Sequence, residues 1–532
     1  MSYDSSKYYD LAKGLKTGIF SGGFVDNVAE IDMAWCYSPY LRNCRLDGQS
    51  VVSRPWHQLF STLEPWDYPR WIGSYLRTIQ ANNRLVVRHN KDADEKLYTI
   101  DSDGVATSIN TGSNITSDER MRFFNVNDVV YCMNWVDKFG KLSGTAYTTP
   151  STVPSNFAPA FAVPFDWKMV ASGRPANPNK IYYSVADNYE DFTSAGTDTG
   201  TTIETVTGLA STNQALFYFT KNTIAVTDKG DIVTSGWTVS YNSTYLQTQE
   251  GAVNHDSIVV VGTEVFYVTP SNSISQITRW ANVNWYDNIN LSDREWEGIT
   301  EYMKQIPKWQ TDSRWYYQED TNLIHWFFKG QDSSIYNKTV VYDVINKKFL
   351  IDTNRYFYGG LFFEGKNFTI SNLEPKVFRD EYSYDDQGTP IPFEYRSKYF
   401  YVSGATFKNT LRESRTLLDM NILAVVIQEI WMDWKMIDTK TIDMDNLPEQ
   451  LLTGIGIQEI GTYAIGTEGL SITPNSDMYE TYILRTKGNV SSKRWVKYQR
   501  RWRMWVVWGR VRLKNFLPRL ESAPPQATNL TE

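Results

Sequence analysis

Histidines and cysteines are the side chains that most often carry chemistry, and this chain holds few of them. They are widely spaced, with no metal-ligand pattern and no Cys-x-x-Cys pair: His57, His89, His255, His325, Cys36, Cys44 and Cys132. His325 lies in the apolar run LIHWFF, where a histidine is more often a packed core residue than a base. We therefore expect no metal, no cofactor and no catalytic residues.

Paired carboxylates would suit glycoside hydrolysis, which needs two acids on opposite sides of a sugar. Asp92 with Asp94 and Asp385 with Asp386 are such pairs, but their spacing does not put them across a substrate. SYDDQGTPI is only loosely similar to the Asp-box turn of sialidases, because Gln387 stands where that turn has glycine. We expect no enzyme activity, and a propeller glycosidase or an adhesin for host polysaccharide remains the alternative.

Two glycine-containing stretches resemble ligand loops without completing them. DSDG at 101–104 begins like a calcium loop, but Gly112 stands where the bidentate glutamate is needed. Glycines then recur every five residues at Gly456, Gly461 and Gly466. This second stretch is either a bulged hairpin or an extended arm that reaches a neighbour or a lumen.

The basic segment 485–514 is the clearest charged feature of the sequence. It carries eleven cationic residues and no acid, so the rest of the chain carries −18 against a total of −7. A net negative chain is not a general nucleic-acid binder, and a charge asymmetry of this size is typical of a partner surface.

Within that segment, arginines alternate with aromatic and aliphatic residues, as in a half-buried strand with a cationic face. Tryptophan and arginine are enriched in protein interfaces, although a strip for stacking bases and a solvated face are also consistent with the pattern. The candidate assembly interface consists of Arg500, Arg501, Trp502, Arg503, Arg510 and Arg512.

The elements that would position these residues are short β-strands. The chain of 532 residues is rich in rings, with 19 Trp, 34 Tyr and 25 Phe, which suit pleated surfaces. Apolar runs separated by Asn, Asp or Gly turns recur across 41–384, which predicts a β-propeller of about six or seven blades. The Asp47-Gly48 step predicts a hairpin, and Pro55 ends its second strand.

The domain organisation follows from shifts in composition. We predict an N-terminal arm over 1–40 and a propeller over 41–384 with a proline-rich loop inserted at about 149–180. A C-terminal all-β domain, sandwich-like, follows over 385–520, and a disordered tail over 521–532. The longest apolar run, near 422–427, is too short to span a bilayer, and the polar N-terminus and odd cysteine count fit a cytosolic protein.

Three segments, in order along the chain, resemble one family of viral proteins. NCRLDGQSVVSRPWHQLF, IYYSVADNYEDFTSAGTDTGTTI and LRTKGNVSSKRWVKYQ are similar to segments of the tail hub, nozzle or packaged-DNA stabilisation protein of short-tailed bacteriophages (podoviruses). Trp56 departs from the pattern, since glycine commonly follows the Arg-Pro step in that family.

The resemblance implies a structural virion protein of the tail, assembled in the host cytoplasm. It implies a homohexameric ring below the portal and the head-to-tail adaptor protein, in contact with tail fibre, spike or needle proteins. Such a ring continues the channel, retains the packaged genome and conducts double-stranded DNA at ejection without sequence-specific binding.

Overall fold

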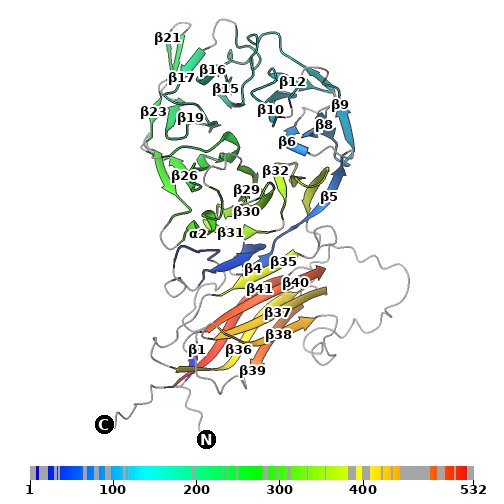
Figure 1. The fold of residues 1–532 in the computed structure, drawn as a ribbon, viewed down its shortest axis with the longest axis vertical. Coiled ribbons are helices and arrows are strands. Elements are labelled where there is room, and N and C mark those ends of the chain that lie inside the picture. The colour runs from blue at the N-terminus through cyan, green and yellow to red at the C-terminus, as the bar shows by residue number, and fades with distance from the viewer. Residues whose placement is uncertain are drawn as a thin grey trace, which may run out of the picture.

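The computed structural model is all-β, with the larger part of the chain in a ring and two further sheets beside it (Figure 1). It describes residues 8–10, 22–28, 33, 36–48, 50–63, 69–76, 83–89, 97–111, 115–117, 119–193, 198–229, 232–235, 238–241, 243–246, 248, 250–279, 286–294, 297–307, 313–331, 333–353, 355–381, 391–397, 408–420, 423–432, 435–443, 480–487, 498–508 and 511–523.

Seven four-stranded antiparallel sheets, formed by the described residues, follow one another around the ring as the blades of a propeller. Blades 1 to 4 are β6 (Pro69–Tyr75), β7 (Arg84–His89), β8 (Leu97–Ile100), β9 (Ala106–Ile109); β10 (Arg122–Val126), β11 (Val129–Met133), β12 (Gly140–Ser143), β13 (Ala146–Thr148); β14 (Phe161–Phe165), β15 (Lys168–Arg174), β16 (Asn177–Tyr183), β17 (Asp198–Thr201); and β18 (Gly208–Ser211), β19 (Ala215–Phe219), β20 (Ile224–Asp228), β23 (Thr244–Tyr245).

Blades 5 to 7 are β24 (Val259–Val261), β25 (Glu264–Val268), β26 (Ile274–Arg279), β27 (Tyr286–Asn290); β28 (Arg314–Gln318), β29 (Leu323–Lys329), β30 (Tyr336–Asp343), β31 (Lys348–Asp352); and β32 (Phe357–Phe363), β33 (Lys366–Ser371), β34 (Lys376–Glu381), β5 (Trp56–Thr62). A separate hairpin, β21 (Ile232–Ser235) and β22 (Thr238–Tyr241), follows β20 of blade 4. The described residues also form two short helices, η5 (His255–Ser257) and α2 (Thr300–Met303).

The last blade is closed by the first propeller strand of the sequence. β5 pairs antiparallel with β34, with Leu59 opposite Phe378 and Gln58 opposite Arg379. A propeller closed in this way joins the two ends of the ring by main-chain hydrogen bonds and leaves no blade incomplete. The prediction of a propeller with about six or seven blades is confirmed, and the number is seven.

Buried and half-buried side chains alternate along the strands, and this alternation explains how the blades pack. In β28, Arg314, Tyr316 and Gln318 are buried, while Trp315 and Tyr317 are half-buried. Every pair of neighbouring blades shares a cluster of buried apolar side chains. Each fully buried side chain of this size contributes about 1.5–3 kcal/mol, so the apolar layers between blades hold the ring together.

Two further sheets lie beside the propeller (Figure 1). One has the strand order β2 (Tyr40–Arg42), β35 (Ile391–Arg396), β40 (Tyr498–Trp508), β37 (Leu423–Met432), β38 (Lys435–Asp443). The other has the order β3 (Cys44–Asp47), β4 (Ser50–Ser53), β41 (Val511–Ala523), β36 (Lys408–Met420), β39 (Glu480–Lys487), with β1 (Tyr8–Asp10) paired to β41.

The N-terminal segment contributes to these sheets before it enters the ring. The predicted propeller began at residue 41, but β2, β3 and β4 belong to the two sheets, and the first propeller strand begins at Trp56. The physical reason is long-range pairing: Val51 and Val52 of the hairpin lie opposite Leu513 and Arg512 of β41. Because these paired strands are far apart in the sequence, the residues around the hairpin do not indicate which strand it pairs with.

The predicted proline-rich loop at about 149–180 is wrong for its second half. β14, β15 and the first residues of β16 lie in this range and belong to blade 3. The prolines are tolerated because of where they stand: Pro164 is in β14, an edge strand of its sheet, and Pro178 precedes the part of β16 that pairs with β17.

The ends of the predicted C-terminal regions also differ from the structure. The tail was expected to be disordered from residue 521, yet β41 continues to Ala523 because its end pairs with β36 and β1. Residues 524–532 lie outside the described part of the chain, as do Gly456, Gly461 and Gly466.

Candidate functional site

The predicted Asp47-Gly48 hairpin carries the chain from the two sheets into the propeller. β3 and β4 pair with Asp47 opposite Ser50, and Gly48 has a φ of 58°, which glycine adopts without strain. Pro55 separates β4 from β5, as the sequence predicted. The hairpin therefore stands at the junction between the propeller and the sheets.

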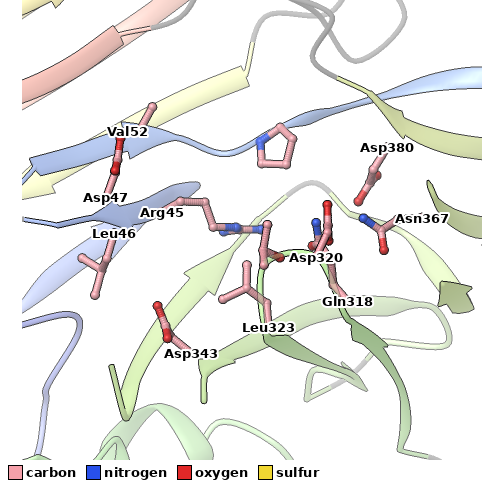
Figure 2. Close-up of a pocket in the computed structure, with 12 residues that line it drawn as sticks. Arg45, Leu46, Asp47, Val52, Gln318, Asp320, Leu323, Asp343, Asn367 and Asp380 are labelled. Atoms are coloured by element: carbon pink, nitrogen blue, oxygen red, sulfur yellow. The ribbon is translucent and has the colours of Figure 1, made fainter. Parts of the chain in front are cut away.

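A cavity of about 320 Å³ opens at this junction (Figure 2). Its walls come from the hairpin, from blade 6 and from blade 7, and the side chains labelled in Figure 2 surround one space. Polar and charged side chains form most of the lining, with a few aliphatic ones from the hairpin and from β29.

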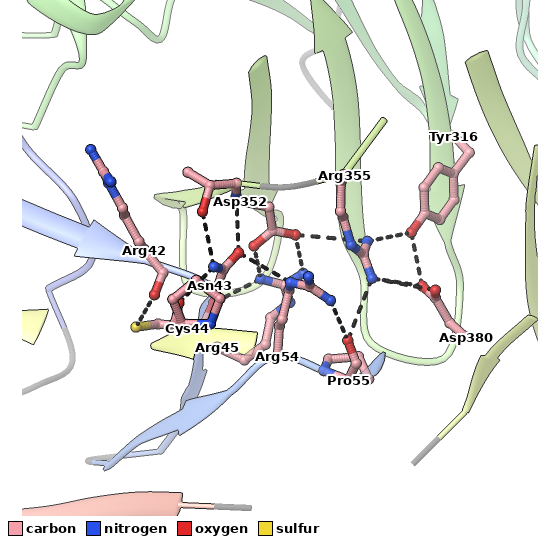
Figure 3. Close-up of polar contacts among 12 residues, drawn as sticks. Arg42, Asn43, Cys44, Arg45, Arg54, Pro55, Tyr316, Asp352, Arg355 and Asp380 are labelled. Carbon is pink, nitrogen blue, oxygen red and sulfur yellow. Dashed lines mark hydrogen bonds and ion pairs between the residues drawn. The ribbon is translucent and has the colours of Figure 1, made fainter. Parts of the chain in front are cut away.

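Asn43 joins three elements behind the cavity (Figure 3). It is fully buried, with a φ of 53°, a left-handed conformation that asparagine tolerates better than most residues. Its Nδ2 donates to the carbonyl of Pro392 at 2.7 Å and to Thr353 Oγ1 at 3.0 Å, and its Oδ1 accepts from the Nε of Arg54 at 3.1 Å. One side chain thus ties the hairpin to β35 and to the end of blade 6.

Arg45 and Asp352 form a bidentate ion pair next to Asn43 (Figure 3). The two guanidinium nitrogens donate to the two carboxylate oxygens at 2.8 and 2.6 Å, and the Asp352 side chain has no exposed surface. Paired, planar contacts of this kind are stronger than single hydrogen bonds and fix the orientation of both groups. The pair connects β3 to the last strand of blade 6.

Arg355 continues the cluster into blade 7. Its Nη1 lies 3.7 Å from Asp352 Oδ2, and its Nη2 donates to Asp380 at 3.3 and 3.2 Å. The side chain of Asp380 is 2% exposed and that of Arg355 is fully buried. Arg54, 1% exposed, donates to the Pro55 carbonyl at 3.1 Å, so the Arg-Pro step is itself part of the network.

Electrostatics keep the central carboxylate ionised. Burial alone would raise the pKa of Asp352, but the guanidinium of Arg45, with Arg355 and Arg54 nearby, lowers that pKa below its ordinary value. A buried ion-pair network contributes little net stability over apolar packing, but removing one partner is costly. The cluster therefore serves to fix the hairpin against two blades in one geometry.

His325 packs against this cluster as a core residue, as its apolar surroundings in sequence predicted. It is fully buried and stacks on Tyr316, with ring centroids 4.4 Å apart and planes 6° from parallel. Burial, and then the positive charges of Arg45 and Arg355, hold its pKa well below the ordinary value. His325 is therefore neutral at physiological pH.

A second ion-pair cluster links blades across the ring. Asp256 of η5, before blade 5, accepts from Arg122 of blade 2 through two bonds of 2.6 Å, and Arg120 pairs with the same carboxylate. Arg122 also donates to the Ala160 carbonyl at 2.7 Å at the entry to blade 3. The Arg122 guanidinium thus joins blade 2 both to the segment before blade 5 and to the entry of blade 3.

These arginines stand beside a cavity of about 450 Å³ in the middle of the propeller. Its lining comes from the inner strands of the blades and includes the rings of Trp71, Phe123, Trp315 and Tyr317. Arg122 and Asp256 both line this cavity, and their direct contact crosses the centre of the ring from blade 2 to the segment before blade 5. Double-stranded DNA does not fit through the propeller centre.

The structure places the described interface residues on two strands that belong to different sheets. Arg500, Arg501, Trp502 and Arg503 lie on β40 and Arg512 lies on β41, while Arg510 lies outside the described residues. β40 is an inner strand, paired on one side with β35 and on the other with β37.

The register of these strands sets acidic residues opposite the arginines. Arg503 lies opposite Glu394 of β35, and Arg501 lies between Glu429 of β37 and Arg396 of β35. On the other sheet Arg512 lies opposite Asp419. Opposite charges on directly paired residues stabilise a sheet, so part of the basic segment has acidic neighbours within the chain itself.

The remaining candidate residues are dispersed. Among the described residues, no group of three His, Cys, Asp or Glu side chains could hold a metal ion, and the three cysteines are free thiols. Asp101 forms a turn in which its Oδ1 accepts from the backbone N–H groups of Asp103 and Val105, at 3.0 and 2.9 Å. The acidic pairs at 92 and 94 and at 385 and 386 lie outside the described residues.

Sequence reasoning missed Asp352, Arg355 and Asp380 as members of the junction. The one indication in the sequence was the presence of charged and polar residues on both sides of the hairpin, in Asn-Cys-Arg before it and Arg-Pro after it. Charged residues placed so close to apolar strands need partners when they are buried, but the sequence does not say which carboxylates supply them.

No helix in the described part of the chain is long and apolar enough to cross a membrane. No family model and no curated protein matches the sequence. Among solved structures, the computationally designed Ika8 protein is similar with a TM-score of 0.33 and 9% identity, covering 60% of this chain and 99% of that one. PorZ, an essential bacterial surface component of the type-IX secretion system of Porphyromonas gingivalis, is similar with a TM-score of 0.38 and 10% identity, covering 75% of this chain and 48% of PorZ.

Proposed function

We propose that the chain is a structural subunit of the tail of a short-tailed bacteriophage, of the nozzle or hub type. The observation that supports this most is the role of the Asn43–Phe60 segment, where the resemblance to that family begins. This segment crosses from the sheets to the closing strand of the propeller and carries Asn43, Arg45 and Arg54 of the buried junction.

A tail ring must hold its shape against the pressure of packaged DNA, which favours subunits whose parts do not hinge. The apolar cluster between blades 5 and 6 continues into the hairpin through Cys44 and Val51 and into β35 through Phe393. Together with the ion-pair cluster, this shared core makes the propeller and the adjoining strands one packed body, as a rigid ring subunit requires.

In the proposed assembly, six copies surround the DNA and the conduit runs between the subunits. The propeller centre is blocked by the contact of Arg122 with Asp256, so each propeller serves as a solid wall of the ring. The net charge of −18 outside 485–514 suits a conduit along which phosphates slide without sticking. The partners are the head-to-tail adaptor and fibre, spike or needle proteins, and the chain has no enzyme activity. The C-terminal sheets pack as a sandwich.

A charge reversal tests this proposal. Changing Arg501 and Arg503 to glutamate should prevent incorporation into tailed particles, because the proposed interface pairs these arginines with carboxylates of a neighbour. The chain should remain folded by circular dichroism but become less stable, since the new glutamates lie opposite Glu429 and Glu394. Lys497→Glu, a reversal in the same basic segment outside the proposed interface, is the control and should still assemble. Normal incorporation of the Arg501 and Arg503 variant would show that these residues are not part of the assembly interface.

A polysaccharide-binding adhesin is the second candidate, favoured by the aromatic lining of the central cavity. Trp315 and Tyr317 supply aromatic surface to the lining, whereas the ring of Trp71 lies against Arg120 and Arg314. Of the two carboxylates in the lining, Asp256 is held by arginines while Glu319 is exposed. Incubation with host capsule or lipopolysaccharide should release no reducing ends. Saturable binding of oligosaccharide that Trp315→Ala abolishes would favour the adhesin over the tail ring.

A further inference from the structure

The solvent-facing side of β2, β35 and β40 carries more positive charge than its own carboxylates balance. In β2, Leu41 is buried and Arg42 is exposed. In β35, the half-buried Glu394 and Arg396 alternate with buried aromatic residues. Since successive side chains of a strand point to opposite faces, Arg42, Glu394 and Arg396 lie on the face that is turned away from the core.

The strand register adds two arginines of β40 to this face. Glu394 lies opposite Arg42 on one side and opposite Arg503 on the other. Arg396 lies opposite Arg501. Directly paired residues share a face of a sheet, so four arginines stand around one glutamate on these three strands. Even with the glutamate of β37 that lies opposite Arg501, the cations outnumber the carboxylates here.

Arg42 is stacked on an aromatic ring rather than paired with an acid. Its guanidinium carbon lies 4.5 Å from the centre of the Tyr40 ring, and that of Arg396 lies 4.6 Å from the same ring. Figure 3 shows the Arg42 side chain directed away from the buried ion-pair cluster. In the described part of the chain Arg42 forms no ion pair, and stacking leaves the N–H donors of its guanidinium to bind another acceptor.

Lys338 of β30 extends the cationic face onto blade 6. Its Nζ lies 5.2 Å from the centre of the Tyr302 ring and donates to Gln305 Oε1 at 3.1 Å, and it too forms no ion pair among the described residues. Burial, and then the positive charge of Arg42, hold the pKa of Lys338 below its ordinary value. The two cations are therefore neighbours, and bringing like charges together costs free energy that an anion beside them would offset.

This excess of cations points to a partner that supplies carboxylates. Arg501 and Arg503 of the candidate assembly interface lie on the same face, so the face continues that interface toward blade 6. The chain itself carries −18 outside 485–514, which makes the surface of a second copy a source of acids. Arginine pairs with carboxylates through planar, bidentate contacts, which give such an interface both strength and orientation.

We propose that Arg42, Arg396 and Lys338, together with Arg501 and Arg503, form the surface that receives an acidic surface of a second copy of the chain. The inference rests on the ring assembly of the proposed function and adds to it three residues outside the basic segment. A basic surface that binds an acidic surface elsewhere on the next copy makes a heterologous contact, which closes into a ring when the rotation between copies allows it.

Sedimentation velocity of the whole purified chain, over a range of protein concentrations, measures association between copies. We expect reversible association that weakens with added salt, because salt screens charges near the surface. Lys338→Glu combined with Arg42→Gln should weaken it about tenfold or more, since a carboxylate then faces the acids of the next copy and one cation is lost. Arg42→Gln alone should weaken it about threefold, as for an exposed ion pair.

A matched variant separates the effect of this face from that of net charge. Lys138→Glu combined with Lys221→Gln makes the same change of charge on exposed lysines of blades 2 and 4, and should leave association unchanged. Glutamine is used at position 42 so that no second acid stands opposite Glu394, and circular dichroism with melting curves verifies that each variant is folded. Since the strand pairs of β2 and β30 are made by the main chain, the substitutions do not remove them.

Four results would overturn the proposal. Association of the Lys338 and Arg42 variant as strong as that of the wild type would remove this contact and leave the ring in place. A wild-type chain that stays monomeric at every concentration would exclude the contact and would also count against the ring. Equal weakening by the Lys138 and Lys221 variant would show that net charge alone governs association. Submicromolar binding of duplex DNA by the wild type, lost in the Lys338 and Arg42 variant, would assign the face to phosphates instead of a second copy.

Discussion

Replacing Asp352 with asparagine tests whether the junction depends on its central charge. The change keeps the size of the side chain and removes the carboxylate that binds Arg45 through two bonds of 2.8 and 2.6 Å. Arg355 then keeps its pair with Asp380, whereas Arg45 loses the carboxylate that it binds among the described residues. Breaking a buried pair from one side costs about 3–5 kcal/mol, and we expect a loss of that size in the free energy of unfolding.

Urea denaturation, followed in parallel by tryptophan fluorescence and circular dichroism, measures this loss. The two probes are compared because large chains do not always unfold in one step. Glu374→Gln is the control: its ion pair with Lys376 is exposed, with Glu374 at 48%, so that change should cost less than about 1 kcal/mol. Adding Arg45→Met to Asp352→Asn should recover part of the loss, because it removes the unpaired charge.

The reasoning would be refuted by a loss for Asp352→Asn no larger than that of the Glu374→Gln control. It would also be refuted if Arg45→Met made the Asp352→Asn variant less stable by the full cost that Arg45→Met has alone. Additive costs of this kind would mean that the two side chains do not interact, in contradiction to their buried, bidentate contact.

Three further predictions concern pH, the basic strand and DNA. Burial, and then the positive charges of Arg45 and Arg355, keep His325 neutral in the folded chain. The unfolded chain therefore gains a proton below about pH 6.5 that the folded chain does not, so the free energy of unfolding should fall below that pH by up to about 1.4 kcal/mol per pH unit. His325→Phe should reduce this slope in a series of denaturation measurements at different pH values. Arg503→Glu should lower the melting temperature, and adding Glu394→Arg should restore it without restoring assembly, since the swap rebuilds the cross-strand pair alone. Duplex DNA should bind the assembled ring weakly at physiological salt, and submicromolar binding with a steep salt slope in a fluorescence titration would show that the conduit is not acidic.

Local signals predicted the parts of the fold that depend on neighbouring residues. Asp47-Gly48 predicted the turn, Pro55 the break between β4 and β5, and the repeated apolar runs the hairpins of the blades. The surroundings of His325 predicted a packed side chain, which the structure confirms. In each case the deciding information lies within a few residues of the feature.

Pairings between distant segments were not predictable. The contact of Leu59 with Phe378 that closes the ring, and that of Arg45 with Asp352 at the junction, each join segments some three hundred residues apart. The prolines near Pro164 indicated a loop because sequence does not distinguish an edge strand, which tolerates proline, from an inner one. The junction cavity itself emerged only once the hairpin, blade 6 and blade 7 were placed around it.

Imaging of the purified chain by negative-stain electron microscopy, alone and with its adaptor protein, tests the tail proposal most directly. The account predicts closed rings of six subunits, with propellers around a central opening wide enough for duplex DNA. Single propellers at every protein concentration, in the presence of adaptor as well as in its absence, would contradict it.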